Sequence, residues 1–543
     1  MSRAVSSLLV VYLLTFPASA EDKKDGDSET VVKAPTRAEM LASKLTFSHE
    51  ITRVTKHRLE SGLPDYAAAI NEHFGKGVKP EENGAILLYE CLGPNPERSD
   101  LDDEFFELMG MKRPPANRKY FKPFAFDLPA EKAREVIDGE FNIAMTRPWT
   151  DKECPEVAKW LKKNGKHVVK AVAGAKKLKY FSPLIVPDGE DDQPIGLVGC
   201  LLPGIQESRS LARFLICRAL NDIAKGNAEA AWTDLMDCHR IGNMIAKGPT
   251  LIEALVGMAI NSIAASGDAI FLDQIEMTPA EISRRRKELA SLPIMPPLVE
   301  QLDWYERLMY LDCVLLLGTG HTKTLDLAGA RLPTVNEGAL KAIMTRVAII
   351  SVDWNTCMRI GNEMYDKLIV GLKKDTHVER AAALAELDEV LNQKKQNTSF
   401  AGFLKVVAET GSSRTAVSEM VANMLVALLM PAMQAVNSAH TRTVQTRANI
   451  NVAYALAEWK TKNGSYPKSL DQLVSAGLLK SAPIDHFDGK PLKYVRGDEG
   501  FLIYSIGQNG EDEGGRWYDD EPQGDDPRIR IPIPEEELLR EDR

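Results

Sequence analysis

Apolar residues recur at three- and four-residue steps through most of the first 395 positions, the spacing of one face of an α-helix. The spacing predicts a helical hairpin from Gln206 to Ala246 with a turn at Lys225-Gly226-Asn227. A core helix, apolar on nearly all sides, is expected from Thr250 to Phe271. Further helices are expected over the ranges 37–74 (interrupted at Gly62-Leu63-Pro64), 83–92, 155–175, 299–317, 340–365 and 376–393. Together these elements predict an all-helical body over residues 37–395.

The pattern changes in the last quarter of the chain. An uncharged run from Met420 to Ala439 leads into an amphipathic stretch that begins at Thr441 and ends at Asn463-Gly464. Short apolar runs separated by Gly and Asp follow, and they predict short strands. The run 420–439 has the length of a membrane span, but its Asn423, Gln434, Asn437 and Ser438 favour a helix buried against the helical body. Contact of this run with a membrane stays as the alternative.

The first twenty residues have the layout of a secretory signal peptide. Arg3 precedes an apolar core from Ala4 to Phe16, and the small residues Ala18-Ser19-Ala20 follow. Residues 21–36 are predicted to be a disordered, charged linker, because EDKKDGDSET at 21–30 contains no apolar side chain to bury. We expect an exported protein of the periplasm or cell envelope whose mature chain begins at Glu21. An uncleaved anchor is the alternative.

Composition and charge narrow the range of functions. The 543 residues carry a net charge of −10 that is spread along the chain, which argues against nucleic-acid binding because that needs a basic surface. The seven cysteines are widely spaced and form no CxxC pair, so neither a zinc site nor a thioredoxin-like motif is indicated. Cys217 and Cys238 fall inside helical apolar patterns and are expected to be core thiols.

An enzyme would need a recognisable constellation of reactive side chains. The sequence holds no GxSxG elbow, HExxH pair, phosphate-binding loop or dinucleotide fingerprint. The best acid/base candidate is His239, next to Asp237 and Arg240 on the second helix of the hairpin, with Glu253 on the helix that follows. A packed structural histidine is the simpler interpretation, because apolar Leu235 lies one turn before His239. A periplasmic enzyme with this acid/base site is therefore the alternative to a non-catalytic protein.

Three motifs near the C-terminus occur in the order of a known family. They are Leu456 to Leu473 (LAEWKTKNGSYPKSLDQL), Pro483 to Tyr494 (PIDHFDGKPLKY) and Phe501 to Gly515 (FLIYSIGQNGEDEGG). In this order the three motifs resemble the type II secretion major pseudopilins. The first is an Asn-Gly helix end with a Tyr-Pro pair, the second is an Asp-containing turn before a strand, and the third is a strand before a glycine-rich loop. The resemblance covers about 60 residues and implies a long helix followed by a small α+β domain with a short antiparallel sheet. The helical body resembles uncharacterised exported bacterial proteins with helical bodies. This resemblance does not indicate an activity.

The predicted fold class is therefore mainly α, with a helical body, a long helix and a pseudopilin-like domain over 411–530, then a charged tail at 531–543. The family places a Glu five residues after its processing glycine, whereas Glu419 lies eight residues after Gly411. We therefore expect no processing at Gly411. The predicted function is an exported, non-catalytic envelope or secretion-associated component, with protein partners in the envelope.

A calcium site is predicted in the tail. Eight acids between residues 511 and 526 face a single base, Arg516, so the segment repels itself unless it is solvated or bridged by a cation. Calcium takes six to eight oxygen ligands in flexible geometry, and the glycines at 507, 510, 514 and 515 let the backbone curl. The resemblance implies Asp512, Asp519, Asp520 and Asn509 as side-chain ligands and Ile506 as a carbonyl ligand. A solvated acidic loop is the alternative.

Overall fold

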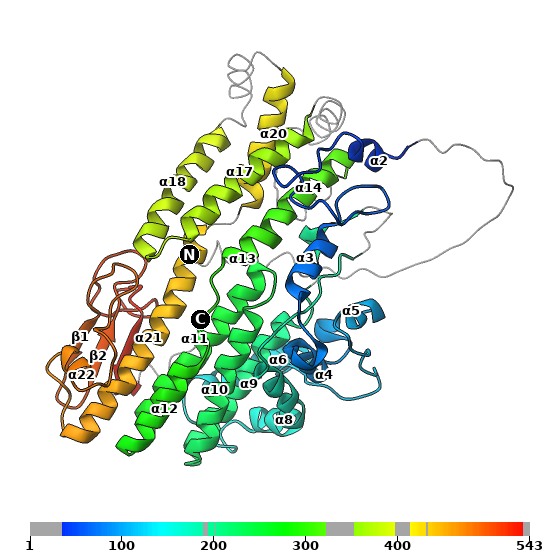
Figure 1. The fold of residues 1–543 in the computed structure, drawn as a ribbon. Helices are drawn as coiled ribbons and strands as arrows, with labels where there is room; N and C mark the ends of the chain where they lie inside the picture. The colour runs from blue at the N-terminus through cyan, green and yellow to red at the C-terminus, as the bar shows by residue number, and fades with distance from the viewer. Residues whose placement is uncertain are drawn as a thin grey trace.

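The computed structural model describes residues 35–187, 194–200, 202–321, 352–396, 413–430 and 433–535. Helices dominate and run side by side along one long direction, and the strands lie together at one end of the molecule (Figure 1). This arrangement confirms the predicted class, mainly α with a small α+β part. The predicted signal peptide, Gly411 and residues 536–543 of the predicted tail lie outside the described residues.

The helices of the first half are α2 (Arg37–Ala42), α3 (Tyr66–Gly75), η2 (Pro80–Glu82), α4 (Gly84–Leu92), η3 (Pro96–Arg98), α5 (Asp103–Leu108), α6 (Ala130–Val136), η4 (Ile137–Phe141), α7 (Asn142–Thr146), α8 (Pro155–Ala175), η6 (Leu197–Gly199), α9 (Ile205–Ala224), α10 (Ala228–Ile245) and α11 (Leu251–Gln274). Those of the second half are α12 (Pro279–Ser291), α13 (Val299–Gln301), η7 (Leu302–Glu306), α14 (Arg307–Thr319), α17 (Trp354–Leu372), α18 (His377–Gln396), α20 (Ser413–Leu429), α21 (Met433–Asn463) and α22 (Asp471–Ser475). The strands are β1 (Lys493–Arg496), β2 (Phe501–Tyr504) and β3 (Arg528–Ile531).

The hairpin α9–α10 and helix α11 form the centre of the body. Gly226 turns the chain between α9 and α10 with a φ of +75°, a conformation that glycine adopts without strain. Helix α11 starts at a capping box in which Thr250 and Glu253 bond each other's backbone N–H groups. Gly242 of α10 and Gly257 of α11 face each other, and a Cβ on either would meet the carbonyl oxygen of the other. Small residues therefore allow α10 and α11 to approach closely.

The predicted helix over 37–74 is the main local difference. Only Arg37–Ala42 and Tyr66–Gly75 are helical, and residues 43–65 form an irregular segment. Asn355 of α17 holds this segment, since its side chain accepts from the N–H of Thr46 at 2.8 Å and donates to the carbonyl of Lys44 at 3.0 Å. A contact with a distant helix thus outweighs the local helical pattern. Of the helix predicted over 340–365, residues 340–351 lie outside the described residues.

Two clusters of buried apolar side chains form the core. One joins α4, α8, α9, α10 and α12 to the C-terminal half of α21 and to the sheet. The other joins α3, α14, α17 and α18 to α20 and the N-terminal half of α21. Helix α21 contributes to both clusters, with Tyr454 packed at 5.7 Å from the Trp232 ring of α10. The segment after residue 411 therefore shares its core with the helical body.

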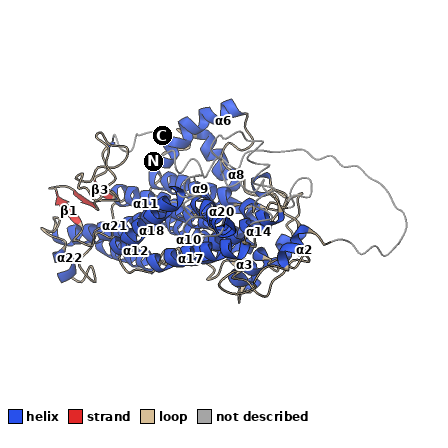
Figure 2. Cartoon of the chain, turned by 90° about the horizontal axis from the view of Figure 1, so that it is seen from above, coloured by secondary structure: helices blue, strands red, loops and turns tan. Residues whose placement is uncertain are grey.

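The sheet is antiparallel in the order β1-β2-β3 and lies beside α21 and α22 at the edge of the molecule (Figure 2). Tyr494 is paired with Ile503 in the first ladder, and Ile503 with Ile529 in the second. Ile503 is fully buried and belongs to the same apolar cluster as α21. This packing fixes the loop between β2 and β3 on the body.

Two helical stretches, Leu251–Gln274 and Arg414–Asn463, are long and apolar enough to cross a membrane by length and composition. Their most apolar windows are 72% and 62% buried inside the protein, which is also the behaviour of core helices. Cys217 and Cys238 are buried and form no disulfide.

Candidate functional site

The loop between β2 and β3 carries the predicted calcium ligands. It runs from Ser505 to Pro527, and its glycines at 507, 510, 514 and 515 all adopt positive φ angles. The N–H of Ser505 donates to the carbonyl of Pro527 at 3.1 Å and closes the base of the loop. The loop is thus anchored at both ends by the sheet and curls back on itself.

Most of the predicted ligands have other contacts. Asp512 pairs with Lys493 at 2.9 Å, and this lysine lowers the pKa of its carboxyl. Asp520 pairs with Arg528 and accepts the N–H of Trp517 at 2.7 Å. Asp519 is exposed. Ile506 is buried, and its N–H donates to Asp485 at 2.8 Å. Among the described residues, Asp512, Asp519 and Asp520 do not form a cluster of acids that could hold a metal ion.

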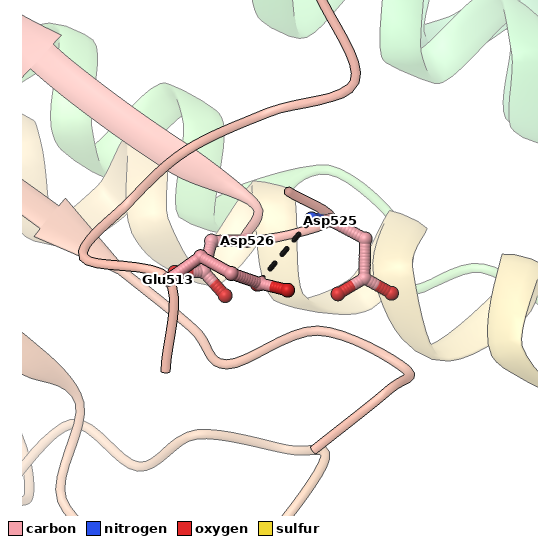
Figure 3. A group of neighbouring side chains, drawn as sticks. All are labelled: Glu513, Asp525 and Asp526. Atoms are coloured by element: carbon pink, nitrogen blue, oxygen red, sulfur yellow. Dashed lines mark hydrogen bonds between the residues drawn. The ribbon is translucent and has the colours of Figure 1, made fainter. Parts of the chain in front are cut away.

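A different set of acids converges in the same loop. Carboxylate oxygens of Glu513, Asp525 and Asp526 lie within 4.8 Å of one another, and Figure 3 shows these three side chains side by side. Asn509, which was predicted, contacts this acidic triad: its side chain donates to Glu513 and its N–H donates to Asp525 at 3.2 Å. Of the five predicted ligands, Asn509 is the one that these bonds place at the triad.

The hydrogen bonds of the acidic triad leave two oxygens without a partner. Asp526 is fully buried, and its Oδ2 accepts the N–H of Gly515 at 2.8 Å. Asp525 Oδ2 accepts the N–H of Gln508 at 3.0 Å. The Oδ1 atoms of Asp525 and Asp526 are both buried and have no hydrogen-bond partner. Buried oxygens without a donor are costly, so this arrangement calls for a proton or a cation.

The electrostatics of the triad lead to the same requirement. Burial, together with the neighbouring Glu513 carboxylate, raises the pKa of Asp526 to about 7. Burial also raises the pKa of Asp525, although the hydrogen bonds that it accepts from two backbone N–H groups lower it. In the described part of the chain, no lysine or arginine forms an ion pair with any of the three carboxylates. Arg442 lowers the pKa of Asp525 without forming an ion pair with it, so the negative charge of the triad is only partly compensated.

Gly507 explains how the backbone closes on the triad. Its φ is +66°, and a Cβ added there would clash with the carbonyl and the Oδ1 atom of Asp525. The backbone at Gly507 therefore lies directly against Asp525 Oδ1, an oxygen without a hydrogen-bond partner. Carboxylate, amide and carbonyl oxygens are the ligands that calcium prefers, so the residues present fit this ion.

Asp485, in the neighbouring turn, is also buried, but both of its carboxylate oxygens accept hydrogen bonds. Its Oδ1 accepts the Ser505 hydroxyl at 2.7 Å and the N–H of Phe487 at 2.8 Å, and its Oδ2 accepts the N–H of Ile506 at 2.8 Å. Both oxygens are satisfied by protein donors. Asp485 therefore has a structural role in holding the turn 483–494 against the end of β2.

The alternative acid/base residues, His239 and Glu253, lie apart. Glu253 is buried in the capping box at the start of α11, where burial raises its pKa to about 7. His239 contacts Asp268, which follows Glu253 by fifteen residues on the same helix, or about 22 Å at 1.5 Å per residue. The structure does not bring His239 and Glu253 into one site.

His239 is held by two hydrogen bonds. Nε2 lies 2.8 Å from Asp268 Oδ2, and Nδ1 lies 2.9 Å from Asn261 Oδ1. The Asn261 amide group donates to the carbonyl of Gly257 at 2.9 Å, so its oxygen is left to face the imidazole. Nδ1 therefore donates to Asn261, and Nε2 shares a proton with Asp268, so the pair is neutral overall. Neither nitrogen has a free lone pair for general-base catalysis.

Comparisons with protein-family models, with curated proteins and with solved structures find no match to this chain. The pseudopilin resemblance therefore depends on the sequence motifs. Sequence reasoning counted Asp525 and Asp526 among the acids of the loop but did not select them. Their position directly before β3 was the available signal, since the start of a paired strand is fixed in space.

Proposed function

We propose that the protein is an exported, non-catalytic component of the cell envelope or of a secretion apparatus, with a pseudopilin-like C-terminal region that binds calcium. The observation that carries the calcium proposal is the acidic triad, in which fully buried Asp526 and its neighbour Asp525 each hold an oxygen without a partner. Glu513, Asp525 and Asp526 are the proposed ligands. Bound calcium would tie the loop 505–527 to the end of the sheet.

Local packing supports the pseudopilin-like part. Gly464 ends α21 with a φ of +79°, and Tyr466 of the Tyr-Pro pair packs against Phe501 of β2 at 5.1 Å between ring centroids. The hydroxyl of Tyr494 in β1 donates to the carbonyl of Pro467 at 2.9 Å. The residues that carry the resemblance thus contact one another and link the helix end to the sheet.

Calcium suits the triad better than a smaller ion does. The three carboxylates offer up to six oxygens from one short loop, and calcium accepts mono- and bidentate carboxylates in irregular geometry. Magnesium demands near-ideal octahedral geometry and keeps much of its water. The proposed ligands come from a glycine-rich loop whose backbone can adjust, which favours the ion with the more tolerant geometry.

Export is the remaining part of the proposal, and Ala18-Ser19-Ala20 motivates it. The intact mass of protein recovered from the cell envelope tests it directly. A mature chain that begins at Glu21 is expected. A chain that still carries residues 1–20 would contradict cleavage.

The calcium proposal is tested by thermal unfolding of the full chain with calcium and with a chelator. The full chain is required because α21 shares its core with the body. At a calcium concentration of a hundred dissociation constants, the free energy of unfolding should rise by about 2.7 kcal/mol. Magnesium at the same concentration should give a smaller rise.

Two variants separate the proposed ligands from the family-based ones. Asp526→Asn should abolish the calcium-dependent rise, whereas Asp519→Asn should keep it, because Asp519 is exposed in the same loop and lies outside the triad. The reverse result would place calcium on the predicted ligands Asp512, Asp519 and Asp520. Coincident transitions with calcium and chelator in the wild type would leave the loop as solvated acidic surface.

A further inference from the structure

A cavity of about 160 Å³ lies between α10, α11 and α21, next to His239. Its mouth is at the loop after α12, because Ile294 lines the cavity and is 80% exposed. Asn261 and Ala265 of α11 form one wall, and Val444 and Arg447 of α21 form another. The cavity thus lies where the C-terminal helix meets the central hairpin, far along the chain from the acidic triad.

Most polar groups of the inner wall bond one another, although the buried Oδ1 atom of Asp268 has no hydrogen-bond partner. Asn261 donates to Asn243 Oδ1 at 3.3 Å, and Asn243 donates to the carbonyl of Pro293 at 3.2 Å. His239 and Asp268 cancel each other's charge. These bonds keep the wall rigid without any ligand.

Arg447 is the lining residue that has N–H groups available for a ligand. Its Nη1 donates to the carbonyl of Pro293 at 2.6 Å, and its Nη2 donates to the carbonyls of Leu289 and Leu292 at 2.8 and 2.7 Å. A guanidinium has five N–H bonds, and these contacts account for three. Nε–H and one Nη1–H remain for a ligand that enters the cavity.

The balance of charge around the cavity is positive. His239 and Asp268 form a neutral pair, and Arg447 adds one positive charge that only backbone carbonyls contact among the described residues. Burial lowers the pKa of Arg447, and the nearby Asp268 partly offsets this shift. In a partly buried site such a charge attracts an anion more strongly than in water.

The rest of the lining combines apolar side chains with the hydroxyl-bearing Ser262, Thr443 and Thr446. Ala265, Met295, Ile294 and Val444 present only carbon and sulfur to the cavity. A cavity of similar size, about 150 Å³, takes up benzene in an engineered protein. An occupant therefore has about six to nine non-hydrogen atoms, one anionic end and an apolar remainder.

We propose that this cavity binds a small organic monocarboxylate, whose carboxylate accepts from Arg447 and whose apolar part packs on Ala265 and Val444. The site is independent of the calcium site, since it uses α10, α11 and α21 and no residue of the loop 505–527. It gives the helical body a ligand-binding role that needs no catalytic chemistry.

Binding is tested on the full chain with butyrate and benzoate as probes, and with butyramide and benzamide as neutral isosteres. Both acids should raise the melting temperature in a saturable way and shift the ring Cε1–H resonance of His239. The amides should bind at least tenfold more weakly, because they lack the charge that Arg447 recognises.

Three variants locate the effect. Ala265→Leu fills the cavity without removing a polar group and should abolish the response, whereas Ser266→Leu, on the exposed face of the same helix, should respond like the wild type. Arg447→Gln should remove the preference for acids over amides. Since Arg447 also contacts the end of α12 and its loss risks misfolding, Ala265→Leu keeps the test decisive. Absence of saturable binding by both acids, equal binding of acids and amides, or an unchanged response in Ala265→Leu would overturn the proposal.

Discussion

The His239 cluster and the acidic triad are both groups of buried polar side chains, but they differ in how their charges are balanced. In the first, the imidazole ring contacts a carboxylate and an amide oxygen, and its pair with Asp268 is neutral overall. In the second, three carboxylates meet, and the hydrogen bonds come from Asn509 and from backbone N–H groups. The charges of the His239 cluster are therefore balanced within the cluster, although Asp268 Oδ1 has no hydrogen-bond partner, whereas the triad needs a proton or a metal ion.

This difference separates structural from binding roles. A matched buried pair stabilises the fold and has no capacity left for chemistry, which is why the general-base alternative at His239 is disfavoured. An unmatched cluster costs stability unless a ligand binds.

The largest effect is expected when the matched pair is broken. Asp268→Ala leaves the buried His239 ring without its acidic partner and should lower the free energy of unfolding by about 3–5 kcal/mol. Urea unfolding of the full chain measures this loss. His57→Ala is the matched control, because it removes a more exposed His–Glu pair, with Glu72, and should lower the free energy of unfolding much less. Equal losses in the two variants would contradict the description of the His239 cluster as a matched pair.

A smaller effect, with a defined pH dependence, is expected at Asp526 without calcium. Its folded pKa of about 7 lies above its unfolded value, so the protonated carboxyl is favoured in the folded protein. Its contribution to stability is complete below pH 4 and is lost as the pH rises through 7. Asp526→Asn mimics the protonated form, so its free energy of unfolding should exceed that of the wild type at pH 8 and match it near pH 4.

The comparison with the variant is necessary because other buried carboxyls also titrate. Burial raises the pKa of Glu207, Glu253 and Glu306 to about 7 as well, so the stability of both proteins should fall between pH 5 and 8. Only the difference between the two curves reports on Asp526. A difference that does not change with pH would show that the triad carries no buried proton.

The smallest effect is expected at Gly507. Gly507→Ala places a methyl group against the Asp525 carboxylate, and Gly510→Ala, also at a positive φ, meets nothing within 4 Å. Both substitutions cost about 1 kcal/mol of backbone strain, and Gly507→Ala should cost about 1–2 kcal/mol more because of the clash. Calcium-free unfolding measures both. Equal costs would mean that Gly507 does not close on Asp525.

Much of the fold follows from local sequence patterns. The hairpin α9–α10 could be predicted because apolar side chains repeat at helical spacing on both sides of Gly226. The helix of Asn83–Leu92 could be predicted because Asn83 is a favourable cap and Gly93 ends the run. The irregular segment 43–65 could not, since its conformation depends on Asn355 of a helix about three hundred residues later.

The sites were less predictable, because they depend on convergence between distant residues. Glu513 and Asp526 are thirteen positions apart, and the strand β3 brings them together only when it pairs with β2. His239 and Asp268 belong to different helices whose close approach requires Gly242 and Gly257. The sequence indicated an acidic calcium-type loop but not which of its acids converge.

The most direct test of the central claim is a calorimetric titration of the full chain with calcium at pH 8 and pH 6. We expect one binding event per chain, weaker at pH 6 because the ion must displace the proton of Asp526, with protons released on binding. Asp526→Asn should show no such event, and Asp519→Asn should titrate like the wild type. No heat of binding in the wild type, or an unchanged titration in Asp526→Asn, would contradict the assignment of the acidic triad as a calcium site.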